Sequence, residues 1–456
     1  MPEGAPKRSN RRAHLAARVV ALLCLAYLVA RTFFGGHDIN VYLYAAGQFI
    51  RGEDIYSLNP FNFYLYSPLF ALMLAPLSFL AMPAARVVWM LSNLALAVRL
   101  WFIWRGMVPT LSAGKRRLWS GAVILLSAGF LNHIFLLGQV TILILWLTTE
   151  GIRQTARGRP LLGAALIALG INFKIIPLLV LVYLGMRGQF RALAYTLALI
   201  GVTLVVPAAV HGWDYNARLL STWRTVINPA GEKFAFEDND GCVSLNAVLP
   251  AYLYDFGAGN PSLKPRHRKV DLPRMITAVP RPTLTAVLQA SRMLLLLVLM
   301  AAMLPRSWLA GPVRELPRRL GLVLRASGTE DEGAGVHLPT SFYWELAMLC
   351  LVTLSIFPHQ MKYSMLYFVP AGAYVLYFYL SLAEGQVARR AADAAVGGVA
   401  MALMFVLAVS GRDLIGSHAV DILDYYHVMG ITVLLFLPIL WYCHPKRFLA
   451  RPAQAA

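Results

Sequence analysis

The amino-acid sequence predicts an all-α integral membrane protein whose helices cross the bilayer many times. Of the 456 residues, 58% are hydrophobic and only 14% are charged, whereas soluble domains carry nearer a quarter charged residues. Apolar runs of about 15 to 22 residues recur along the chain, separated by Arg-rich linkers. Such runs are typical of membrane helices and are longer than the strands of a membrane β-barrel.

The charge and the cysteines exclude several classes of function. A formal net charge of +19 is compatible with nucleic-acid binding, but the Lys and Arg residues sit mostly in short loops and at the termini, where they set membrane orientation. We therefore expect no nucleic-acid partner. Four cysteines are too few for a disulfide framework, and no CxxC or Cys/His spacing typical of a metal site occurs.

The first predicted span covers Leu15 to Phe34 and follows a basic N-terminus. It resembles a signal peptide, but no small-x-small cleavage site follows its apolar core, so we expect it to remain in the chain. Cytoplasmic loops are enriched in Lys and Arg, which places the N-terminus in the cytoplasm. Residues 35–84 then emerge on the opposite side as a first outer loop.

The apolar run from Pro68 to Met82 is the segment that the charges exclude as a span. If this run and Arg86 to Trp104 both crossed, the basic residues in 105–117 would lie outside, against the positive-inside rule. The run is also short and contains Pro76. We therefore expect a re-entrant or interfacial helix, whose non-helical ends are buried in protein or face a watery cavity.

The remaining apolar runs alternate across the membrane with consistent charges. They predict about twelve spans in a single domain over 1–456, with both termini cytoplasmic. A second outer loop is expected over 211–283 and a cytoplasmic linker over 305–337. The spans expected after the first are Arg86 to Trp104, Trp119 to Asn132, Val140 to Thr149, Leu161 to Asn172, Ile175 to Met186, Leu193 to Val210, Leu284 to Leu304, Phe342 to Phe357, Tyr363 to Leu382, Ala394 to Val409 and Ile431 to Tyr442.

The unusual polar residues collect on one side of this predicted topology. A transporter more often places its ionisable residues mid-span, near the bilayer centre. The pattern therefore indicates a site at the outer interface, whereas Glu345, near an inner end, is expected to have a local structural partner. The outer residues are Asp38, Asp54, His133, Gln139, Lys174, Arg224, Ser244, Asn246, His359 and Lys362.

Asp38 is the first charged residue after the first span. It precedes a stretch with helical spacing that begins at Asn40, in which Tyr42 and Phe49 share one face and Tyr44 and Arg51 share another. Such an amphipathic helix is expected to lie along the membrane interface. An Asp just before a helix is a favoured N-cap, so capping and catalysis are both open for Asp38.

Several segments resemble glycosyltransferase family 87, membrane enzymes that take a sugar from a polyprenyl phosphate. The first is "GHDINVYLYAAGQFIRGEDIYSLNPFNFYLYSPLFALMLAPL", followed by "LLGQVTILILWL", "GAALIALGINFKIIPLLVLVYL", "CVSLNAVL" and "SIFPHQMKYSMLYFVPA". The resemblance covers about residues 30–380. It departs from the family at Cys242-Val243, where Asn-Gln is frequent, and at His359 to Lys362, where a Trp and paired histidines are frequent.

The resemblance implies a helical bundle of the GT-C type with a catalytic acid in its first large outer loop, which makes Asp38 the candidate base. Direct attack on the donor would invert the anomeric centre. The candidates for holding the donor phosphate are Lys174, His359, Lys362 and Arg224, and Gln139, Asn246 and Tyr66 are further substrate-binding candidates.

Each candidate also has a structural alternative. Lys174 can snorkel to the interface, and Arg224 can form the polar face of an interfacial helix. Gln139 can pair with backbone or with neighbouring helices. His359 can be a plain interfacial histidine, and Lys362 can simply flank its span. The basic run 264–269 is expected to be a solvated loop near anionic lipid. The acidic run 237–240 invites a metal ion, but the family resemblance implies none, so no metal and no cofactor is predicted.

The expected function is therefore an inverting transfer of a sugar, most simply mannose, from a polyprenyl-phosphate donor. The acceptor would be a lipid or a cell-envelope glycan outside the cytoplasmic membrane. The main alternative is a lipid-linked sugar transporter or flippase without catalysis, in which Asp38 is only a cap. A third is a non-catalytic subunit of envelope assembly.

Overall fold

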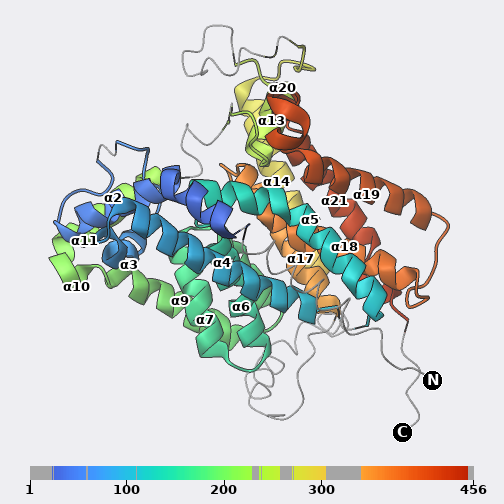
Figure 1. Cartoon of the computed structure of the whole chain (residues 1–456), viewed down its shortest axis with the longest axis horizontal. Coiled ribbons are helices and arrows are strands. Elements are labelled where there is room, and N and C mark those ends of the chain that lie inside the picture. The colour runs from blue at the N-terminus through green and yellow to red at the C-terminus, as the bar shows by residue number, and fades with distance from the viewer. Residues whose placement is uncertain are drawn as a thin grey trace, which may run out of the picture.

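The computed structural model describes residues 23, 25–57, 60–108, 110–228, 236–237, 239–256, 270, 272–303 and 340–449. Within these residues the regular structure is helical, apart from one isolated β-bridge between Val387 and Phe448, which confirms the all-α class. Figure 1 shows the helices in chain order from blue to red. Their bounds are α2 (His37–Ile50), α3 (Pro68–Ser78), α4 (Met82–Gly106), α5 (Ala113–Leu137), α6 (Thr141–Ala156), α7 (Pro160–Phe173), η1 (Ile176–Leu178), α8 (Leu179–Met186), α9 (Phe190–Val205), α10 (Ala208–His211), α11 (Trp213–Val226), α13 (Leu245–Leu253), α14 (Arg281–Met303), α17 (Thr340–Ile356), η4 (Lys362–Phe368), α18 (Val369–Leu382), α19 (Asp393–Val409), α20 (Arg412–Tyr425), α21 (Val428–Tyr442) and η5 (Pro445–Arg447).

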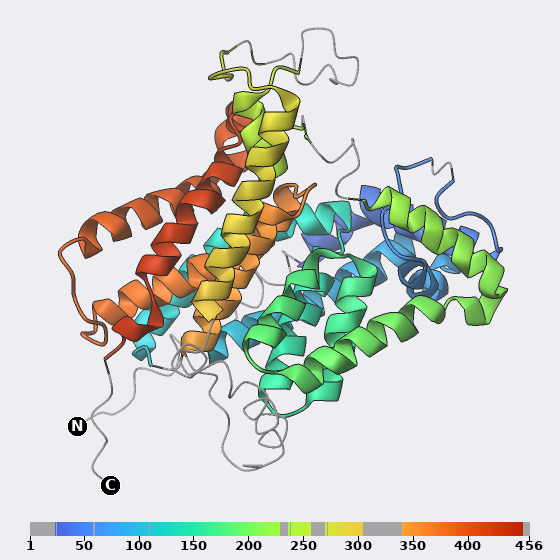
Figure 2. The ribbon, with the colours of Figure 1, turned by 180° about the vertical axis from the view of Figure 1, so that it is seen from behind.

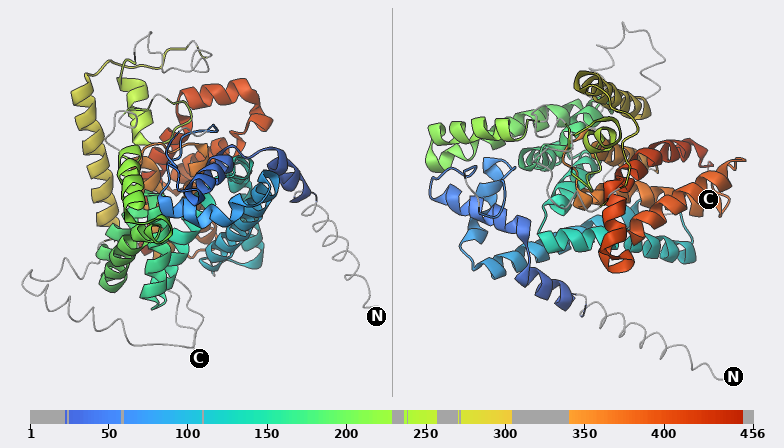
Figure 3. Two further views of the ribbon diagram at one scale, coloured as in Figure 1. Left: turned by 90° about the vertical axis from the view of Figure 1, so that its left-hand side faces the viewer. Right: turned by 90° about the horizontal axis from the view of Figure 1, so that it is seen from above.

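The helices form two groups that share α5. In the first, α6 packs on α7, α7 on α9, and α2 on α3. In the second, α17 packs against α14, α18 and α21, which run side by side in Figure 2. α5 contacts α2 and α4 of the first group and α18 and α19 of the second. Viewed from above, α10 and α11 (green) lie at one end of the molecule and α19 lies at the other (Figure 3).

The protein is a polytopic membrane protein, but the expected number of about twelve spans is wrong. Among the described residues, six helices are long and apolar enough to cross a membrane, and one bent pair raises the number to seven. The bent pair is α19 with α20, whose axes differ by 104°. The six are Met82–Gly106, Ala113–Leu137, Phe190–His211, Arg281–Met303, Lys362–Leu382 and Val428–Arg447.

The other predicted spans correspond to helices that end too early. α7 has 14 residues and rises about 21 Å at 1.5 Å per residue, whereas the hydrocarbon core of a bilayer is about 30 Å thick. The helices Ile176–Met186 and Thr340–Ile356 are also short, whereas the first predicted span is described only over Leu25–Phe34, because its start lies outside the described residues. Sequence hydropathy counts such helices as spans because a helix buried in protein is as apolar as one that faces lipid.

α17 is such a buried helix and forms the centre of the second group. Every residue from Phe342 to Ser355 is buried, although one of them is the carboxylate Glu345. Glu345 accepts hydrogen bonds from the Arg187 guanidinium and, at 3.3 Å, from the Tyr183 hydroxyl. This confirms the structural partner expected for Glu345, since a buried charge needs a partner of opposite sign.

The outer-loop predictions are only partly covered by the structure. The run from Pro68 to Met82 divides into α3 and the start of α4, and an 11-residue helix is too short to cross a bilayer. Its re-entrant or interfacial placement stays a prediction. The predicted second outer loop contains α11 and α13, whereas the basic run 264–269 and the linker 305–337 lie outside the described residues.

Glycine lets α6 and α7 approach each other closely. A Cβ atom added at Gly163 would lie 2.1 Å from the Thr155 hydroxyl oxygen and 2.6 Å from the Gly151 carbonyl oxygen. Contacts this short force the two helices apart, because a side chain and a backbone carbonyl both stand in the way. The close approach therefore requires glycine at position 163.

We expect Gly163→Ala to lower the free energy of unfolding by about 1–3 kcal/mol, the usual cost of overpacking. The measurement is the midpoint of thermal unfolding in detergent. Gly129→Ala is the matched control, because Gly129 lies in the middle of α5 with nothing within 4 Å of an added Cβ. Alanine there should be neutral or stabilising, by up to about 1 kcal/mol. Equal effects of the two substitutions would contradict the close packing.

Candidate active site

Two glycines dock the first turn of α2 onto the end of α5. Gly36 is the N-cap of α2 with φ 90°, and its N–H donates to the Leu136 carbonyl oxygen at 3.1 Å. Gly138 ends α5 with φ 71°, and a Cβ there would lie 2.7 Å from Cβ of Ile39. Side chains other than glycine are strained at such φ values. The docking places Gln139 directly beside Asp38.

Asp38 is not the N-cap of α2, so the capping alternative is wrong. Gly36 occupies that position without a side-chain bond, and Asp38 lies inside the first turn. Its carboxylate instead accepts a hydrogen bond from the Gln139 side-chain amide. Asp38 is half-buried, and its position in the first turn lets the helix dipole stabilise its negative charge.

A chain of hydrogen bonds orients the Gln139 amide towards Asp38. The Tyr42 hydroxyl donates to Gln139 Oε1 at 3.4 Å, which leaves the NH₂ group of the amide facing Asp38. Tyr42 and Tyr66 share a further hydrogen bond, with 2.8 Å between their hydroxyl oxygens. Gln139, Tyr42 and Tyr66 are all buried. Because each partner is fixed by the next, Asp38 has a defined orientation.

Lys174 adds a positive charge to the site that contains Asp38 and Tyr66. It follows α7, where the chain leaves the helix before η1, and its Nζ lies 5.7 Å from the ring centre of Tyr66 and 5.4 Å from that of Tyr363. Within the described part of the chain, no carboxylate forms an ion pair with Lys174. The ammonium is half-buried, and aromatic rings are its neighbours.

Burial and mutual attraction set the pKa values of Asp38 and Lys174. Burial raises the pKa of the Asp38 carboxyl above its ordinary value, although the Gln139 hydrogen bond and the Lys174 charge act in the opposite direction. Burial lowers the pKa of Lys174 to about 8, with the Asp38 charge opposing the shift. The carboxylate is therefore a stronger base than an exposed aspartate, and Lys174 is positively charged at neutral pH.

Further candidates form a second cluster next to the first. His359 adopts a left-handed backbone with φ 57°, and its N–H donates to Glu237 Oε1. Lys362 forms an ion pair with Asp424 at 2.6 Å, so its charge is already neutralised. Asn246 is buried and accepts a hydrogen bond from the Arg292 guanidinium.

Tyr363 interacts with members of both clusters. Its ring centre lies 5.4 Å from Lys174 Nζ, and the charges of Asp38 and Glu237 both act on its hydroxyl. The structure thus gathers Asp38, Gln139, Tyr66 and Lys174 into one site, with the second cluster beside it. Arg224 is not part of either cluster, because its side chain is exposed in the last turn of α11.

Sequence reasoning missed Tyr42, Tyr363, Glu237 and Cys242. Tyr42 lies four residues after Asp38, a spacing that places both on one face of a helix. Tyr363 directly follows the candidate Lys362. Glu237 and Cys242 carry no motif with His359, from which they are separated by more than 100 positions.

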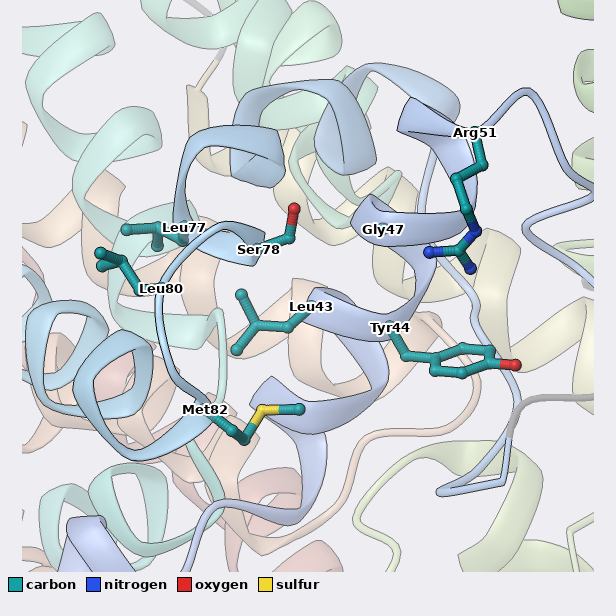
Figure 4. Close-up of a pocket in the computed structure, with 8 residues that line it drawn as sticks. All are labelled: Leu43, Tyr44, Gly47, Arg51, Leu77, Ser78, Leu80 and Met82. Atoms are coloured by element: carbon teal, nitrogen blue, oxygen red, sulfur yellow. The ribbon is translucent and has the colours of Figure 1, made fainter.

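A separate cavity of about 230 Å³ lies on the other side of α2 (Figure 4). Leu43, Gly47 and Arg51 line it from α2, and Leu77 and Met82 lie across from them. At 100° per residue, this face of α2 is opposite the one that carries Asp38, Tyr42 and Phe49. The cavity is therefore distinct from the Asp38 site.

Comparison with known proteins supports an enzyme of the expected kind. The chain matches the profile of Glycosyltransferase family 87 over residues 64–324, more than half of its length. The matched region contains Tyr66, Gln139 and Lys174, and Asp38 precedes it. A search of curated proteins found no match. From the family match and the membrane-spanning helices together, the chain is a membrane glycosyltransferase that belongs to glycosyltransferase family 87.

Proposed function

We propose that this glycosyltransferase moves a sugar, most simply mannose, from a polyprenyl phosphate to a hydroxyl of a lipid or cell-envelope glycan. The proposal rests on two groups of one site. Asp38 is a hydrogen-bonded carboxylate, and Lys174 is an ammonium group near it that forms no ion pair in the described chain. Sugar transfer from a phosphate needs both a base and a cation. Family membership favours this reading over a flippase, since the family consists of transferases.

Lys174 is suited to hold the donor phosphate. The group that leaves is a phosphate monoester, on which negative charge accumulates as the bond to the sugar breaks. A half-buried ammonium without a carboxylate partner stabilises that charge more than an exposed one does, because the surrounding dielectric is lower. The position of Lys174 at the end of the short apolar helix α7 also allows the polyprenyl chain to stay in the bilayer.

Asp38 is suited to accept the acceptor proton. In the proposed step, the acceptor oxygen attacks C1 of the sugar, the bond between C1 and the phosphate oxygen breaks, and the hydroxyl proton passes to Asp38. Polyprenyl phosphate leaves with the electron pair. A single displacement of this kind inverts the anomeric configuration. Gln139 and the Tyr42–Tyr66 pair keep the carboxylate in place.

The charge distribution also bears on the membrane topology and on the other candidate residues. We propose that both termini are cytoplasmic and that the Asp38 site faces outward, because the basic N-terminal residues follow the positive-inside rule. His359 and Asn246 stay secondary candidates for the substrate, since both belong to the cluster next to the Asp38 site. Lys362 and Arg224 are weaker ones, because one is ion-paired and the other is exposed.

The test is transfer by the purified protein in liposomes, with a bacterial envelope glycolipid extract as acceptor. We expect label to move from polyprenyl-phosphate [³H]mannose to the extract and not from GDP-[³H]mannose, because the single positive charge of Lys174 matches a monophosphate better than a nucleotide diphosphate. NMR of the product should show an anomeric configuration opposite to that of the donor. Protein-free liposomes are the control. Transfer from GDP-mannose alone, or retention of configuration, would refute the proposal.

A further inference from the structure

Glu237, Cys242 and His359 bring three kinds of metal-ligating atom together. A carboxylate oxygen, the thiol sulfur and a ring nitrogen all lie within 4.8 Å of one another. Glu237 and Cys242 are buried, and His359 is half-buried. The residues come from two segments, the loop before α13 and the connection between α17 and η4. Only the tertiary fold makes them neighbours.

One atom of this cluster lacks the partner that its burial demands. Glu237 Oε1 accepts the His359 N–H, and the Cys242 thiol interacts with the same carboxylate, whereas Oε2 is buried and has no N–H or O–H donor among the described residues. Glu237 is only 5% exposed, so water does not replace the missing partner at the surface. An unsatisfied buried carboxylate oxygen is costly, and a bound cation removes that cost.

Contacts around the cluster hold the loop before α13 against the connection between α17 and η4. The Val243 N–H donates to the Gln360 carbonyl oxygen at 2.7 Å, and a ring nitrogen of His427 lies 2.9 Å from the Cys242 carbonyl oxygen. The Met361 sulfur lies 3.1 Å from the Cys242 sulfur. The left-handed backbone of His359 is unfavourable for a non-glycine residue, and these contacts maintain it. The ligand positions are therefore fixed by the fold.

The donor set selects the kind of ion. Thiolate, imidazole and carboxylate are the ligands of Zn²⁺, which binds three or four of them in tetrahedral geometry. A thiolate and a carboxylate together neutralise its charge, which a buried site requires. Mg²⁺ and Ca²⁺ prefer oxygen ligands only.

We propose that Glu237, Cys242 and His359 bind a Zn²⁺ ion that fixes the loop before α13 to the connection between α17 and η4. The proposal departs from the expectation of no metal, which followed from the family resemblance and from the lack of a Cys/His metal spacing in the sequence. Within the acidic run 237–240, Asp240 pairs with Arg274 at 3.3 Å, and Glu237 joins the cluster. In this proposal His359 binds a metal ion and not the phosphate of a substrate. The proposed site is near the Asp38 site, since the charges of Glu237 and Asp38 both act on the Tyr363 hydroxyl.

The first experiment measures zinc directly. Protein is purified in detergent, stripped with a chelator, dialysed against ZnCl₂ and then against metal-free buffer, and analysed by mass spectrometry for metals. We expect about one zinc per chain, reduced at least tenfold in Cys242→Ala. The matched control is Cys350→Ala, which removes another buried thiol, in α17, and should keep its zinc. No zinc in the wild type, or equal zinc in both variants, would overturn the proposal.

A second measurement avoids variants that fail to fold. Co²⁺ added to the stripped wild-type protein should give a thiolate-to-metal charge-transfer band in the near ultraviolet and visible bands typical of tetrahedral cobalt. Added Zn²⁺ should remove both. A folded wild-type protein without these bands would overturn the proposal. Neither readout uses sugar transfer, so a negative result here leaves the proposed function untouched.

Discussion

Replacing Asp38 with asparagine should lower kcat for sugar transfer by about 10²–10⁴-fold, the usual contribution of a positioned general base. The asparagine oxygen can still accept the hydrogen bond from Gln139, and the side chain has nearly the same shape. It cannot accept the proton of the acceptor hydroxyl. We therefore expect normal expression, normal thermal unfolding and donor binding close to wild type. The measurement is initial-rate transfer in liposomes, with donor binding determined separately.

Asp54→Asn is the matched control, since Asp54 is another carboxylate of the same predicted outer loop. Asp54 is exposed, and its carboxylate accepts the backbone N–H of Tyr56 at 3.0 Å, as expected of a turn. An asparagine can accept the same bond, so we expect wild-type turnover. If Asp38→Asn keeps turnover and Asp54→Asn loses it, the base has been assigned to the wrong residue. If both keep turnover, neither carboxylate is the base.

Substitution of Lys174 should have the second-largest effect. Lys174→Met keeps the length and apolar stem of the side chain but removes the charge, and we expect kcat to fall about 10²–10³-fold, as for loss of one group that stabilises a developing anion. Lys174→Arg keeps the charge and should retain more activity than Lys174→Met. The measurement is transfer at saturating acceptor, together with donor affinity for each variant.

The pH dependence of kcat/KM separates an electrostatic role of Lys174 from a structural one. Asp38 acts as a base only when deprotonated, so activity is lost as the pH falls through its raised pKa. Lys174 acts only when protonated, so activity is lost as the pH rises through about 8. The profile should be bell-shaped. In Lys174→Arg the alkaline limb should move to much higher pH, because a guanidinium stays protonated.

A structural role for Lys174 predicts a different result. The alkaline limb would then be the same in Lys174→Arg as in the wild type, and Lys174→Met would lose thermal stability along with turnover. A wild-type profile that stays flat between pH 7 and pH 9 would likewise contradict a phosphate-binding ammonium with a pKa of about 8. One series of pH profiles and thermal-unfolding measurements on purified protein distinguishes an electrostatic role of Lys174, a structural role, and a flat profile that contradicts both the pKa and the role.

The sequence by itself determined the class of the protein and part of its site. Composition and apolar runs predicted an all-α polytopic membrane protein, since the bilayer requires every backbone polar group to be paired within helices. The motifs predicted family 87. The positions of polar residues at the ends of apolar runs and the family resemblance together also predicted Asp38, Gln139, Lys174 and Tyr66 as site residues.

Only the tertiary structure decided the rest. Whether an apolar helix crosses the membrane or is buried in protein depends on its neighbours. Short, largely buried helices such as α7 and α17 are therefore not among the six or seven candidate spans of the described residues, where about twelve were expected. Gly36 placed Asp38 inside a helix turn, which hydropathy cannot show. Lys362 forms an ion pair with Asp424, and Glu237 lies beside His359. Both contacts join residues that are far apart in the chain. Such contacts arise from packing between helices, and no local pattern of residues encodes them.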